Sequence, residues 1–132
     1  MTPHERLRFL ATKLREPLPA DIEFNMGVWQ QPHLCGTAAC AVGFAGTLPE
    51  LQADGLEAVL GTSDDIGSVI FDGKPGFEAA SAFFGISREG AERLFDPFLY
   101  SVAHHRITPA MVADRIDETL AGIVGAETAP PS

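Results

Sequence analysis

The first segment of the chain carries apolar residues at helical spacing. Leu7, Leu10 and Leu14 fall on one face of a helix. Residues 2–5, Thr-Pro-His-Glu, form a capping box in which the threonine caps the helix and the glutamate reaches back to it. Pro17 cannot continue a helix. The pattern therefore predicts an N-terminal helix that ends at this proline.

A different spacing follows, in which apolar and polar residues alternate over 22–28. A period of two favours an extended segment or a short strand, and residues 29–34 are predicted to form a loop. Thr37 is a suitable N-cap for a helix over about residues 38–46. Because this helix is apolar on every side and rich in small residues, we expect neighbouring elements to bury it.

The central residues 56–76 are predicted to hold a small hairpin. Residues 56–60 and 68–71 are its two apolar arms, and the polar link 61–65 separates them. Asp72-Gly73 favours a further turn directly after the second arm.

Helical spacing and capping signals return after this hairpin. A helix is predicted over 77–84 and ends at Gly85. Ser87 caps a second helix over 88–95, which ends at Asp96-Pro97. Thr108-Pro109 begins a last helix, which carries Val112, Ile116 and Leu120 on one face. The predicted fold class is mainly α, or α+β with a minor β hairpin, wrapped around the buried helix over 38–46. We expect a single domain over 1–124 and a flexible C-terminal tail over 125–132.

Composition and charge narrow the classes of partner. The chain has 132 residues, enough for a self-sufficient core. Nine Lys and Arg against eighteen Asp and Glu give a net charge of −9. Binding to polyanions depends on Lys and Arg, so neither nucleic acid nor an anionic membrane is expected as a partner. No apolar run approaches the ~20 residues of a membrane span.

The cysteines and the N-terminus bear on the compartment. The first residues carry charges of both signs and no apolar stretch of a signal peptide. Two cysteines without a secretory signal fit a reducing environment better than a disulfide scaffold. We therefore expect a cytoplasmic protein.

Cys35 is the candidate nucleophile, because it lies just before the N-terminus of the predicted helix over 38–46. A thiolate at a helix N-terminus is stabilised by the dipole and the free amides, which lowers the pKa of the thiol. A general base is available from His33, His104 or His105, and an oxyanion donor from Gln30 or Gln31. The alternative is a structural or incidental cysteine.

Residues of the metal-binding types are also present but lack the usual spacing. His33, Cys35 and Cys40, with the later His104-His105 pair, are suitable ligands. A structural zinc site normally contains a tighter Cys pair, and Cys40 lies in a run that is typical of a core. No metal site and no cofactor are therefore predicted.

Two further patterns contain arginines that could form binding sites. Residues 78–94 resemble a helix-turn-helix, but Arg88 and Arg93 are offset by Glu89 and Glu92. This balance of charge favours an αα-corner that packs on the core, and it disfavours a DNA-binding motif. Arg106 beside the two histidines is either an anion site or part of a solvated loop.

The segment from Cys35 to Ala45 resembles a Cys-Gly-Thr-x-x-Cys-x-x-Gly-x-Ala signature of small uncharacterised bacterial and phage proteins. The similarity extends to residues 24–29, 83–87 and 91–95. One departure is Ala-Val-Gly-Phe at 41–44, where Ile-Ala-Gly-Trp would be expected. The resemblance implies one compact domain and carries no activity.

The function expected from these patterns is a small, non-enzymatic binding or interaction domain. Its partner would be a protein or a small molecule that is bound near Trp29, His33, Cys35 and Thr37. The alternatives are a cysteine-dependent hydrolase with Cys35 as nucleophile and a metal- or redox-responsive domain. Self-association is left open. We also expect Cys35 to be alkylated faster than Cys40, because burial keeps a thiol protonated.

Overall fold

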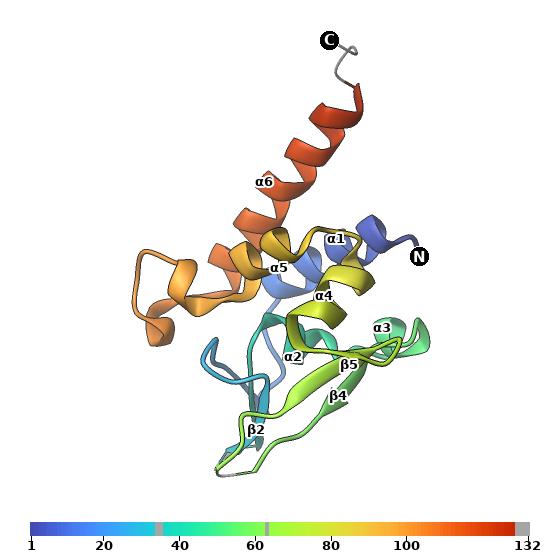
Figure 1. Ribbon diagram of the computed structural model, residues 1–132. Coiled ribbons are helices and arrows are strands. Elements are labelled where there is room, and N and C mark those ends of the chain that lie inside the picture. The colour runs from blue at the N-terminus through green and yellow to red at the C-terminus, as the bar shows by residue number, and fades with distance from the viewer. Residues whose placement is uncertain (34–35, 63, 129–132) are drawn as a thin grey trace.

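The four longer helices lie together on one side of the strands (Figure 1). The computed structural model describes residues 1–33, 36–62 and 64–128 of the chain. Its helices are α1 (Pro3–Arg15), α2 (Ala41–Ala45), α3 (Pro49–Ala53), α4 (Gly76–Phe84), α5 (Arg88–Phe95) and α6 (Pro109–Thr128), with 3-10 turns η1 (Pro97–Leu99) and η2 (His104–Arg106). Its strands are β1 (Ile22–Phe24), β2 (Gln30–His33), β3 (Gly36–Ala39), β4 (Glu57–Val59), β5 (Ser68–Phe71) and β6 (Lys74–Pro75).

The N-terminal helix α1 forms as its sequence pattern predicts. Thr2 Oγ1 accepts a hydrogen bond from the Glu5 amide, and the Glu5 carboxylate accepts one from the Thr2 amide, so the capping box is complete. The face that carries Leu7, Leu10 and Leu14 is buried. It packs mainly against α6, whose buried side chains Val112, Ile116 and Leu120 form the predicted stripe. Both helices are therefore held by one apolar interface.

The αα-corner of α4 and α5 is also confirmed. Gly85 ends α4 with a φ of 64°, a conformation that favours glycine. Ser87 then caps α5 by accepting a hydrogen bond from the Gly90 amide at 3.0 Å. Ala91 and Leu94 on α5 are buried against the core, so the apolar face of this helix serves packing.

The predicted hairpin over 56–76 is present in a three-stranded sheet ordered β4-β5-β6. Strands β4 and β5 are antiparallel, with Val59 opposite Ser68. Asp72 and Gly73 both have positive φ, 53° and 73°, which turns the chain tightly into β6. The short third strand had not been predicted.

The region before α2 contradicts the sequence-based predictions. The helix over 38–46 capped by Thr37 is wrong, because residues 36–39 form β3, and the loop over 29–34 is wrong, because 30–33 form β2. Strand β3 lies in the middle of a sheet ordered β1-β3-β2, parallel to β1 and antiparallel to β2. Its alanines favour a helix by themselves, but backbone pairing on both sides decides for a strand.

The predicted fold class therefore requires correction. A mainly α fold with one minor hairpin is wrong, because two three-stranded sheets support the helices in an α+β fold. About half of the chain is helical. The domain boundaries 1–124 and the tail over 125–132 stay predictions, and residues 129–132 lie outside the described part of the chain.

The small residues of α2 serve close packing against the neighbouring strands. All five residues of this helix are buried. A Cβ at Gly43 would overlap the carbonyl of Trp29, and one at Gly46 would lie 2.7 Å from the Cβ of Ala58. The buried helix is thus shorter than predicted. Gly43 within it lets the backbone of Trp29, just before β2, come close, and Gly46 at its C-cap does the same for β4.

Candidate functional site

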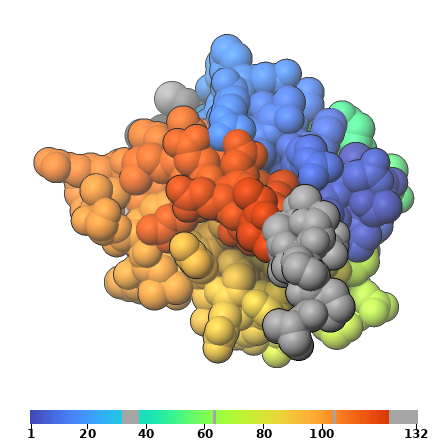
Figure 2. All heavy atoms as spheres, turned by 90° about the horizontal axis from the view of Figure 1, so that it is seen from above, coloured from blue at the N-terminus to red at the C-terminus, as the bar shows by residue number. Residues whose placement is uncertain are grey.

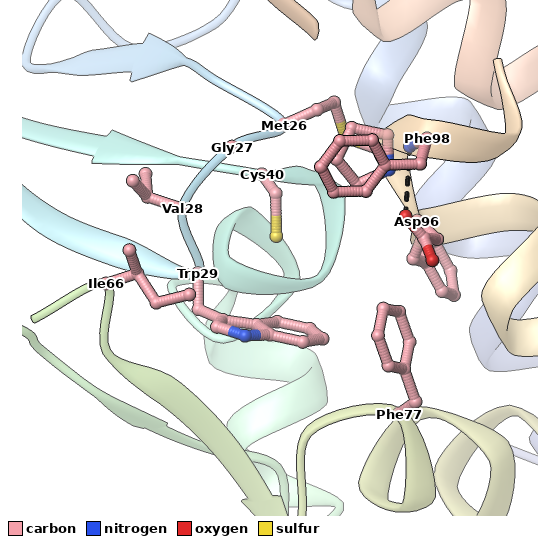
Figure 3. A pocket seen from close by; sticks show the side chains of 11 residues that line it. Met26, Gly27, Val28, Trp29, Cys40, Ile66, Phe77, Asp96 and Phe98 are labelled. Carbon is pink, nitrogen blue, oxygen red and sulfur yellow. Dashed lines mark hydrogen bonds between the residues drawn. The ribbon is translucent and has the colours of Figure 1, made fainter.

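An apolar pocket lies between the segment that follows β1 and the segment that follows α5 (Figure 3). Its volume is about 240 Å³. Apolar side chains dominate its wall and include Met26, Val28, Trp29, Phe77, Phe95 and Phe98. Concave, mostly apolar sites of this kind are where proteins bind small molecules or the side chains of partners.

Trp29 is fixed in the pocket wall by its backbone and by its ring. Its amide donates a hydrogen bond to the Ile66 carbonyl at 2.9 Å. Its indole meets the ring of Phe77 edge to face, with ring centroids 5.2 Å apart. Figure 3 shows the indole and the Phe77 ring on the same side of the pocket. The structure thus places this predicted binding residue in the pocket, and its role in binding stays a prediction.

Phe98 stands beside the pocket on η1 and is 92% exposed. Asp96 caps this turn, because its Oδ1 accepts a hydrogen bond from the Phe98 amide at 2.9 Å. On either side of the turn, Phe95 and Tyr100 are buried, and the Tyr100 hydroxyl donates to the Leu94 carbonyl at 2.6 Å. The ring is therefore held out by a turn that is anchored at both ends.

A second hollow of about 510 Å³ adjoins the pocket. The two share Gly27, Val28, Pro97 and Phe98, and the second continues toward Tyr100, Val102 and Ala103. We call the two together the apolar groove. Its outer wall is the segment over 95–103, which protrudes at the edge of the molecule in Figures 1 and 2, in orange.

Cys40 lines the pocket as the N-cap of α2. Its sulfur accepts a hydrogen bond from the Gly43 amide at 3.4 Å. Burial raises the pKa of the Cys40 thiol to about 11, so the group is protonated at neutral pH. The predicted burial of Cys40 is confirmed, although the residue precedes the helix instead of lying inside it, and its slow alkylation stays a prediction.

Cys35, the candidate nucleophile, lies outside the described residues. The helix that was expected to lower the pKa of its thiol does not begin at Thr37, since α2 begins at Ala41 after strand β3. The backbones of His33 and Gly36 pair across β2 and β3, and Thr37 pairs with Pro32. The side chains of His33 and Thr37 are outside the described set, so their roles and the reactivity of Cys35 stay predictions.

The two glutamines proposed as oxyanion donors form side-chain hydrogen bonds to backbone carbonyls. Gln30, which is buried, donates through Nε2 to the Gly43 carbonyl at 2.8 Å and thereby links β2 to α2. Gln31 donates through Nε2 to the Thr62 carbonyl at 2.8 Å. Among the described residues, no group of three or more His, Cys, Asp or Glu is placed to hold a metal ion. His105 and Arg106 lie on η2, and both are exposed.

Sequence reasoning missed Phe98 and Asp96 as site residues. The Asp-Pro pair was interpreted as a helix stop, and the aromatic residue behind it received no role. One signal was available, because Phe98 directly follows the helix-ending pair Asp96-Pro97 and so lies outside the buried stripe of α5, which consists of Ala91, Leu94 and Phe95.

Comparisons with protein-family models, with curated proteins and with solved structures found no match to this chain. The resemblance to the Cys-Gly-Thr proteins therefore stays a prediction. Within the described ranges, none of the helices has both the length and the apolar character to cross a membrane.

Proposed function

We propose that this chain is a non-enzymatic binding domain whose apolar groove receives an apolar side chain of another molecule. The observation that carries the proposal is the exposed ring of Phe98 beside a pocket walled by Trp29 and Phe77. Exposed aromatic rings next to apolar hollows are typical of interaction sites. Nothing in the core requires this ring, because its neighbours Phe95 and Tyr100 already anchor the segment.

The energetics favour a partner that covers both hollows. Burying one aromatic side chain removes about 150–250 Å² from water, which at about 25 cal/mol per Å² is worth roughly 4–6 kcal/mol. Association costs at least about 4 kcal/mol in lost freedom of motion. One ring therefore does little more than offset that cost, and useful affinity requires contacts along the length of the groove.

The two alternative functions have no supporting observation in the described part of the chain. Cys40 is protonated and capped, and the sulfur of Cys35 is outside the described residues. A cysteine-dependent hydrolase and a metal- or redox-responsive domain therefore stay predictions from sequence.

Trp29 makes the proposal testable, because it is the only tryptophan of the chain and it lines the pocket. The probe is the neutral dye 6-propionyl-2-(dimethylamino)naphthalene, which can accept energy from an excited indole. We expect saturable quenching of Trp29 fluorescence as the dye is titrated into the protein. Phe98→Ser should weaken binding of the dye about fivefold or more, the usual effect of truncating an important contact.

The matched control is Leu60→Ser. Leu60 is an exposed apolar residue, 54% accessible, that does not line the groove. This variant should bind the dye as the unaltered chain does. Absence of saturable quenching, or equal weakening by both substitutions, would show that the groove is not the binding site.

A further inference from the structure

Two acidic positions lie at opposite sides of the pocket. Asp96 lines it beside Phe98, and Ile66 lines the other side, as Figure 3 shows. Asp65, which is exposed and does not itself line the pocket, directly precedes Ile66 in the chain. Each carboxylate caps its own turn through Oδ1, which accepts from the Phe98 amide at 2.9 Å and from the Gly67 amide at 3.0 Å, respectively. The second oxygen of each has no hydrogen-bond partner among the described residues and remains available to a ligand.

The chain segments around the groove carry acidic residues only, while two arginines from α5 and α6 contact rings that line it. Arg88, which is paired with Glu92, lies 5.8 Å from the Phe77 ring centroid, and Arg115 lies 3.7 Å from that of Tyr100. The segments 25–29, 64–67 and 95–103 contain three Asp and no Lys or Arg. Arg93 and Arg106 border the last segment in sequence, and neither lines the groove.

Some carboxylates elsewhere in the molecule form ion pairs. Asp54 contacts Arg6 at 3.1 Å, and Glu92 contacts Arg88 at 3.1 Å. In the described ranges, neither Asp65 nor Asp96 takes part in an ion pair. The groove therefore has an apolar floor, a lining carboxylate at Asp96 and a nearby carboxylate at Asp65, and neither carboxylate forms an ion pair among the described residues.

We propose that the occupant of the groove is a segment of a partner protein in which an apolar anchor is flanked by Lys or Arg. This inference rests on the proposed function and specifies the class of partner. The anchor enters the pocket between Trp29 and Phe98, and the flanking cations lie against Asp96 and Asp65. A cation beside Asp96 also reaches the exposed face of the Phe98 ring two residues later, which attracts cations through its quadrupole.

The overall charge of the chain favours the same occupant. A net charge of −9 attracts a basic segment at long range and repels a second copy of this chain. Screening limits this attraction at high salt, since the Debye length falls from about 10 Å at 0.1 M to about 3 Å at 1 M. Affinity for the segment should therefore decrease as salt is added.

The test uses three blocked peptides of equal length without tryptophan. Each has a central Leu-Phe-Leu, flanked on both sides by lysines, by serines or by glutamates, and Trp29 fluorescence reports binding. We expect the lysine peptide to bind most tightly and the glutamate peptide least tightly, with about tenfold between these two at low salt and a smaller ratio at about 0.5 M salt.

Asp96→Asn tests the charge of the carboxylate separately from its role as the cap of η1. Asparagine keeps an oxygen that can cap η1 but carries no charge. This variant should reduce the preference for lysine over glutamate about threefold and leave affinity for the serine peptide unchanged. Asp72→Asn is the control, because Asp72 is an exposed carboxylate on the β5–β6 turn, outside the groove, and asparagine tolerates its positive φ.

The outcomes distinguish the inference from the proposed function. If the lysine and serine peptides bind equally and Phe98→Ser weakens both, the groove binds apolar side chains without selecting charge, and only the inference is overturned. If the dye binds but none of the peptides does, the inference is again overturned while the proposed function stands. If sedimentation shows dimers that Phe98→Ser dissociates, the occupant is a second copy and the basic segment is excluded.

Discussion

Phe95 and Phe98 lie three residues apart and have opposite surroundings. Phe95 is 2% exposed at the end of α5 and packs against Phe84, with ring centroids 5.8 Å apart. Phe98 is 92% exposed on η1. Between them, Asp96 and Pro97 end the helix and redirect the chain. A phenylalanine side chain therefore stabilises the core in one region and is exposed on the surface in the next, because the backbone changes direction between them.

Phe95→Ala should give the largest loss of stability in this comparison. Removing a fully buried phenylalanine loses its transfer free energy and leaves a cavity beside Phe84, which together cost about 3–5 kcal/mol. Urea unfolding monitored by circular dichroism measures the change in the free energy of unfolding. A loss below about 1 kcal/mol would mean that the end of α5 is not part of the core.

Alkaline pH should lower the free energy of unfolding by an intermediate amount, through two buried groups that line the groove, Tyr100 and Cys40. Burial raises the pKa of Tyr100 from 10.0 to about 12 and that of Cys40 from 9.0 to about 11. Both groups are neutral in the folded chain and lose their protons more easily in the unfolded chain. Their contribution is fully present below pH 9 and is lost as the pH rises through about 11 and 12.

The expected loss is on the order of 2 kcal/mol after allowance for solvent screening. Urea unfolding at about pH 8 and about pH 10.5 measures it. Cys40→Ala should reduce the difference in the free energy of unfolding between the two pH values, because alanine has no proton to lose. An unchanged pH dependence in this variant would contradict the assignment to the buried thiol.

Phe98→Ala should give the smallest effect on stability, within about 0.5 kcal/mol of the unaltered chain. The ring is exposed and therefore contributes little burial that unfolding would reverse. The same urea measurement applies, with Phe95→Ala as the contrasting variant. A loss comparable to that of Phe95→Ala would place Phe98 in the core and remove the basis for a binding groove.

Local signals in the sequence were sufficient for most of the helices. The ends of α1 and α5 are set by side chains three residues from the amides they cap, as Thr2 and Ser87 show. The helix stop at Gly85 and the hairpin turn at Asp72-Gly73 are equally local. Such contacts form between residues a few positions apart in the chain, so a short stretch of sequence contains both partners and predicts the contact.

Only part of the candidate site could be predicted from the sequence. Trp29 could be named as a candidate because it begins the segment that leads to Cys35, which was predicted to be a loop. The pocket beside it also needs Phe77 and Phe98, which lie far along the chain. No local pattern connects these residues, because the fold alone brings them together.

Tertiary structure decided the strand at 36–39 and the exposure of Phe98. Gly36-Thr37-Ala38-Ala39 has no strand-forming pattern, yet it becomes the middle strand because β1 and β2 supply backbone partners on both sides. That pairing moves the start of the buried helix to Ala41 and makes Cys40 its cap. Sequence by itself determined the elements whose hydrogen bonds and apolar stripes are local. Long-range pairing and the direction of one turn decided the rest, because their free energy depends on residues that meet only in the folded chain.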